Sequence, residues 1–133
     1  MKSDTQTVSI DAEPSKVHTF LREVPNLPRW AIGFAKSVRR DGDAWKLETG
    51  GGEMGLRLVT DADQGTVDFW LSPAPGVEAL AASRVVPRGA GTEYVFTQFQ
   101  APGMSDEAFA QSVGTLGHEL VVLKALLEVE CPL

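Results

Sequence analysis

Two charged side chains lie inside otherwise apolar runs, and they are the residues best placed to do chemistry. Asp68 falls within residues 66–71 and Arg84 within residues 77–86. A placed carboxylate can move a proton, and a guanidinium can stabilise a developing negative charge, as an aldol-type cyclisation requires. Because an unpaired buried carboxylate is costly, Asp68 needs a partner if it faces inward, and Arg84 is the natural one. Asp68 and Arg84 are therefore the candidate catalytic residues, and the alternative is a cross-strand pair on the solvent face.

Tryptophans supply the apolar part of the candidate site. Alternation along a strand puts Trp70 on the same face as Asp68, and Trp30 follows Pro25 and Pro28 in a tight turn or a second short helix. Core packing is the simpler role for an indole, and an aromatic wall around a ligand is the alternative. The predicted ligand-binding residues are Trp30, Asp68, Trp70 and Arg84.

Metal and cofactor chemistry finds little support. The two histidines, His18 and His118, are a hundred residues apart, and neighbours such as His118 and Glu119 point about 100° apart on a helix. The one cysteine, Cys131, stands close to the C-terminus, far from an activating group. The glycine run 50–52 has no following helix, so it predicts a hairpin turn and not a phosphate cradle. No metal and no cofactor is expected, with His118 in solvent and His18 at the surface or half-buried.

Composition narrows the class of protein. The chain has 133 residues, of which 43% are hydrophobic and 23% charged, and its net charge is −6. This length predicts a single domain over residues 1–133, and the acidic balance argues against nucleic-acid binding. The first residues contain no apolar signal segment, and no run approaches the ~18 apolar residues of a membrane span. A cytoplasmic location without a membrane span is the expectation.

Short apolar runs separated by Gly, Asp and Pro predict seven strands, joined as an antiparallel meander after the first. Around Pro14, residues Val17, Phe20 and Leu21 form a helical stripe between the first two strands. The expected strands are residues 5–10, 34–40, 45–49, 54–60, 66–71, 77–86 and 93–99.

A long C-terminal helix is predicted from Ser105 to near Glu130, because Ser105 is a good N-cap and no proline interrupts the stretch. Its buried stripe should contain Phe109, Val113, Leu116, Leu120 and Leu127. A cylinder cannot fill a curved sheet, so we expect a cavity between them with its mouth near Trp30. Gly114 and Gly117 either leave room for a ligand there or allow close backbone packing.

The order of these elements resembles the SRPBCC superfamily of START-like and Bet v 1-like helix-grip domains. The motifs that carry the resemblance are Ala12-x-Pro14-x-x-Val17-x-x-Phe20-Leu21, the stretch 25–31, and the segments 102–109 and 119–128. The ending is similar to small bacterial proteins of the polyketide cyclase/dehydratase-like type. The resemblance implies an α+β helix-grip fold, with about seven antiparallel strands around the long helix, and a cavity for an apolar small molecule.

Two functions are consistent with this fold, since the superfamily carries several. The first is binding of a lipid, polyketide or aromatic molecule, with or without a metal-free cyclase or dehydratase (lyase) activity. The second is a protein-interaction module, similar to chaperone co-activators, that uses an exposed surface. A cavity above about 300 Å³ with converging polar groups favours the first, and a filled core with a large apolar patch favours the second.

A second apolar set lies on the C-terminal helix, more than 90° from its main stripe. It comprises Val122, Leu126 and Val129. These residues would be exposed to solvent in a monomer unless the short helices after the first strand cover them. Since an isologous patch needs only itself as partner, they predict a homodimer contact.

Overall fold

A computed structural model describes all 133 residues, and its elements follow the order expected from the sequence. The first strand is followed by two short helices with a 3-10 turn between them. Six further strands and one long helix come next along the chain. Their bounds are β1 Ser3–Ile10, α1 Pro14–Arg22, η1 Val24–Asn26, α2 Leu27–Trp30, β2 Ser37–Asp41, β3 Ala44–Thr49, β4 Gly52–Asp61, β5 Thr66–Ala74, β6 Val77–Arg88, β7 Gly91–Phe99 and α3 Asp106–Glu130.

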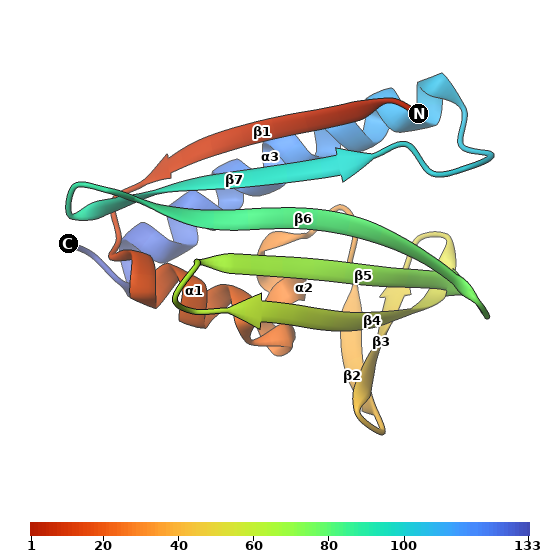
Figure 1. Cartoon of the computed structure of the whole chain (residues 1–133), viewed down its shortest axis with the longest axis horizontal. Coiled ribbons are helices and arrows are strands. Elements are labelled where there is room, and N and C mark those ends of the chain that lie inside the picture. Colours follow the sequence, from red (N-terminus) through yellow and green to blue (C-terminus); the bar gives the residue numbers. More distant parts are fainter.

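The seven strands form one curved, open antiparallel sheet in the order β1-β7-β6-β5-β4-β3-β2. Consecutive strands pair as hairpins from β2 to β7, and β1 returns to the edge of β7, where Val8 lies opposite Tyr94. Figure 1 shows α3 running behind β1 and β7. Helices α1 and α2 lie lower in the view, on the same face of the sheet as α3. The predicted α+β helix-grip fold is confirmed, with seven strands and the long C-terminal helix.

Helix α3 begins where the sequence predicts, and most of its predicted apolar stripe is buried. The Oγ of Ser105 accepts a hydrogen bond from the backbone N–H of Ala108 at 3.1 Å, which satisfies a free donor at the N-terminus. The stripe of α3 enters the core, and only Val113 among its predicted members stays half-buried. The buried stripe consists of Phe109, Leu116, Leu120, Leu123 and Leu127.

One strand starts later than expected. The sequence predicts a strand from Phe34, but β2 begins at Ser37, because the backbone N–H groups of Phe34 and Ala35 both donate to the carbonyl of Ala31. This extra helical turn follows α2 directly. It directs the Phe34 ring toward the space under α3 and away from the sheet ladder.

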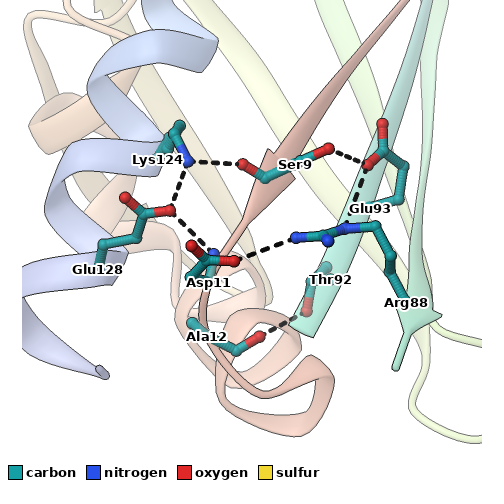
Figure 2. Close-up of polar contacts among 8 residues, drawn as sticks. All are labelled: Ser9, Asp11, Ala12, Arg88, Thr92, Glu93, Lys124 and Glu128. Carbon is teal, nitrogen blue, oxygen red and sulfur yellow. Dashed lines mark hydrogen bonds and ion pairs between the residues drawn. The ribbon is translucent and has the colours of Figure 1, made fainter. Parts of the chain in front are cut away.

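Polar contacts tie the C-terminal half of α3 to the end of β1 (Figure 2). The Nζ of Lys124 donates to the carbonyl of Ser9 at 2.9 Å and pairs with Glu128 one turn further along. Glu128 in turn accepts the backbone N–H of Asp11 at 2.9 Å. The hydrogen bond from Lys124 is the main reason why the pKa of Glu128 is lowered.

The hairpin between β6 and β7 joins the same set of contacts. Arg88 lies between the carboxylates of Asp11 and Glu93, at 3.2 and 3.7 Å (Figure 2). Next to these ion pairs, the hydroxyl of Thr92 donates to the carbonyl of Ala12 at 2.8 Å. Thr92 is fully buried. These contacts fix the turn from β1 into α1 at the end of the molecule where α3 finishes.

None of the helices is both long enough and apolar enough to cross a lipid bilayer.

Candidate functional site

A cavity of about 360 Å³ lies between α3 and the concave face of the sheet. Fifteen of its twenty lining residues are hydrophobic, and none is Lys, Arg or His. The wall is built from α2, the segment after it, strands β4 to β7, the loop before α3, and α3 itself. Five aromatic side chains contribute: Trp30, Phe34, Phe69, Phe96 and Phe99.

Strands β5, β6 and β7 line the cavity through residues that alternate along each strand. On β5 these are Phe69 and Leu71, and the Phe69 ring lies 6.0 Å from that of Phe96 on β7. On β6, the facing positions include Ala79 and Ala81, whose methyl side chains are short. Small residues opposite a helix leave the space that bulkier ones would fill, so the sequence of β6 creates part of the volume.

The cavity opens at the end of the sheet away from α1. Among its lining residues only Pro73 and Phe99 are exposed, and Phe99 is 41% accessible. These residues lie near the C-terminal ends of β5 and β7. Trp30, near which the mouth was expected, is only 3% exposed.

The only carboxyl group in the wall belongs to Glu119, on the buried face of α3. Glu119 is 5% exposed, and its Oε2 accepts a hydrogen bond from the backbone N–H of Gly33 at 3.1 Å. Burial raises the pKa of Glu119 to about 7, against the opposing effect of the backbone N–H groups of Gly33 and Phe34. A carboxyl group with this pKa can donate or accept a proton near neutral pH.

Gly33 allows the segment after α2 to approach α3 closely. A Cβ atom at this position would lie 2.6 Å from the Cγ2 of Thr115 and 3.7 Å from the Oε2 of Glu119. At the first of these distances either Thr115 or the segment would have to shift. Glycine at position 33 therefore allows the hydrogen bond to Glu119 without displacing Thr115.

Glu119 and Thr115 also border a second, more open depression on the outer side of α3. Its other lining residues are Ile32, Gly33, Gly114 and His118. The carboxyl group of Glu119 thus lies between the apolar cavity and a polar surface hollow.

Of the four residues predicted to bind ligand, the structure places only Trp30 in the cavity wall. Asp68 and Trp70 project from the opposite face of β5, because Val67, Phe69 and Leu71 fill the inner face. Trp70 is half-buried there beneath Arg57, whose guanidinium lies 5.1 Å from the indole ring.

Asp68 and Arg84 do not form the expected pair. In the register of β5 and β6, Asp68 lies opposite Ala82, and Arg84 lies opposite Thr66. Arg84 is exposed, and its Nε donates to the carbonyl of Gln64 at 3.1 Å. The prediction that Asp68, Trp70 or Arg84 contributes to the cavity wall was wrong, since all three lie on the convex face.

The glycines of α3 serve purposes other than widening the cavity. Gly114 faces the outer depression. Gly117 faces β1, where the Oε1 of Gln6 lies 3.0 Å from the position of an added Cβ, and Gln6 donates to the carbonyl of Val113. Close packing of α3 against β1 is therefore the role of Gly117.

His118 lies in solvent as predicted, but the prediction that His18 lies at the surface or half-buried was wrong, because His18 is buried. His118 is exposed, while His18 is 4% exposed with its Nε2 3.1 Å from the carbonyl of Thr66. Sequence reasoning considered Glu119 only as part of a metal pair with His118 and missed its place in the wall. The signal was its position three residues after Leu116 and four before Leu123, inside the apolar stripe.

Comparison with solved structures identifies the fold. A START superfamily protein from Mycobacterium smegmatis superposes with a TM-score of 0.68 at 14% identity, over 94% of this chain and 98% of that one. The Aha1 dimer protein from Colwellia psychrerythraea gives 0.77 at 18% identity, over 97% and 98% of the two chains. The di-domain ARO/CYC protein BexL of the BE-7585A biosynthetic pathway gives 0.74 at 19%, over 96% of this chain and 47% of BexL.

These likenesses show that the chain shares the fold of these proteins, which is the helix-grip fold that the sequence resemblance implied. No family model matches the sequence. No curated protein matches it either.

Proposed function

We propose that this protein binds a hydrophobic small molecule (a lipid, a polyketide or an aromatic compound) in the cavity between α3 and the sheet. The observation that carries the proposal is the cavity itself, about 360 Å³ with fifteen hydrophobic lining residues of twenty. This volume falls within the range of roughly 300–1,000 Å³ that is typical of ligand pockets. A few polar groups, among them Gln98, Thr115 and Glu119, would orient the ligand.

A cyclase or dehydratase reaction would have to use Glu119, because Asp68 and Arg84 lie outside the cavity. The ligand-binding proposal does not depend on such a reaction. The cytoplasmic location inferred from the sequence stays a prediction.

The protein-interaction alternative has weaker support. Its expected sign was a filled core with a large exposed apolar patch, whereas this core is hollow. The exposed large apolar side chains are distributed along the chain: Met1, Ile32, Val59, Val77, Phe99, Val121, Val129 and Leu133.

Fewer apolar residues are free for the predicted homodimer contact than the sequence suggested. Val122 and Leu126 are half-buried against the core, and only Val129, 80% exposed, remains free for a partner. Sedimentation at high concentration tests this prediction. A species with the mass of one chain, 14.3 kDa, would contradict it.

A titration with the neutral apolar dye Nile red tests the proposed function. Ala81→Leu places a larger side chain in the cavity wall and should abolish or strongly weaken dye binding. Ala82→Leu is the matched control, since Ala82 points to the other face of β6 and should leave binding unchanged. Native mass spectrometry of protein purified from its own host would reveal a retained ligand. Equal dye binding by both variants would contradict a site in this cavity.

A further inference from the structure

The chemistry of the cavity wall restricts its ligand by charge. Three lining residues carry a hydroxyl or a carboxyl group: Ser112, Thr115 and Glu119. Gln98 has its amide N–H groups directed to Asp4 and to the carbonyl of Ser112. Since no lining residue is cationic, an anionic head group entering this space would find hydroxyl donors but no countercharge, and it would face a carboxyl group.

The position of Glu119 restricts the ligand further. Glu119 and Trp30 are buried in the wall, at 5% and 3% exposure, whereas the exposed lining residues are Pro73 and Phe99. A ligand that reaches Glu119 therefore enters with its polar head first and leaves its apolar body along the aromatic wall. Aromatic faces attract cations electrostatically, and a desolvated cation gains most from them.

Resting on the proposed function, we infer that the ligand is an apolar molecule with a protonated amine, which pairs with the carboxylate of Glu119 in the buried part of the cavity wall. The carboxylate compensates the charge of the ammonium group, and the aromatic rings of Trp30 and Phe34 lie in the same wall. The net charge of −6 favours the approach of cations over anions.

The ion pair requires Glu119 to be ionised. When its carboxyl group is protonated, binding of an ammonium ion releases that proton. The groups around Glu119 are His118 on α3, which borders the outer depression, and backbone N–H groups of the segment after α2. On α2, Arg29 is engaged with Glu130. Amine affinity should therefore rise as the pH rises through about 7, the pKa of Glu119.

Three probes with one skeleton test the inference: 1-naphthylmethylamine, 1-naphthylmethanol and 1-naphthoic acid, titrated calorimetrically. The amine should bind most tightly and the acid most weakly. Glu119→Gln should weaken amine binding by about tenfold or more, because a hydrogen bond to a buried charged group is lost. The alcohol should change by less than about threefold, which is within the spread of a neutral hydrogen bond.

Two further variants serve as controls. Glu107→Gln removes the same charge from an exposed position on α3 and should leave all three affinities unchanged. His118→Gln should preserve the rise of amine affinity with pH if Glu119 causes it. Glutamine at position 119 keeps an acceptor for the N–H of Gly33, and thermal unfolding checks that the variant folds.

The outcomes separate the two proposals. If none of the probes binds the wild-type protein, the proposed function itself is contradicted. If the alcohol or the acid binds as tightly as the amine, or Glu119→Gln leaves amine binding unchanged, the amine inference is overturned and the cavity remains a ligand site.

Discussion

The Oε2 of Glu119 on α3 accepts the backbone N–H of Gly33, 86 positions earlier in the chain, at 3.1 Å. This hydrogen bond joins the long helix to the segment after α2 beside the cavity. It holds a buried carboxyl group in place where no cation balances its charge. Any change that moves Gly33 or alters the charge of Glu119 should therefore affect both stability and the cavity.

Gly33→Ala should destabilise the protein by about 1–3 kcal/mol, the usual cost of overpacking. The new Cβ would lie 2.6 Å from the Cγ2 of Thr115 and would force either Thr115 or the segment to shift. Urea denaturation measures the loss. Thr115→Ser removes that methyl group, so the double variant should recover most of the stability; a double variant as unstable as Gly33→Ala would contradict this explanation.

The unfolding free energy should depend on pH through Glu119. Because its pKa is raised from 4.5 to about 7, the folded state retains a proton that the unfolded state loses between these values. The folded protein therefore loses stability as the pH rises from 4.5 to 7, and the loss is complete above that range. Denaturation of wild type and Glu119→Gln at several pH values should show the difference shifting in favour of the variant. A pH-independent difference would contradict the raised pKa.

Trp70→Ala and Arg84→Ala should leave Nile red binding unchanged, because both side chains lie on the convex face of the sheet. Trp70→Ala should cost some stability, since the indole is half-buried beneath Arg57. Phe96→Leu, a change inside the cavity, is the comparison and should alter dye affinity. Weakened binding in either convex-face variant would mean that the ligand lies elsewhere.

Thr92→Val should cost about 1–3 kcal/mol, because the fully buried hydroxyl of Thr92 satisfies the carbonyl of Ala12 and valine has no donor. Lys124→Met, in the exposed part of the same contacts, should cost less than about 1 kcal/mol, as surface ion pairs usually do. Thermal or urea unfolding compares the two. A larger loss for Lys124→Met would show that the exposed contacts matter more than the buried hydrogen bond.

Most of the fold could be predicted from the sequence, because it follows from local patterns. Alternating apolar residues separated by turn residues mark the seven strands, and Ser105 with a proline-free stripe marks α3. The exception is the start of β2, where three residues predicted as strand join a helical turn after α2. Backbone hydrogen bonds to Ala31 decide that boundary, and side-chain periodicity does not reveal them.

The functional site depended on the tertiary structure. Both faces of β5 carry apolar residues, so alternation groups Asp68 with Trp70 but does not show which face is concave. The packing of Val67 and Phe69 against the core decides this, and a one-residue change of phase reverses every side chain. Glu119 stands in the buried stripe in the sequence, but its partner Gly33 is distant in the chain, and only the folded protein brings them together.

The sequence by itself therefore determined the order and type of the elements, which local patterns encode. The tertiary structure decided which polar group enters the cavity, because that depends on the packing between distant segments.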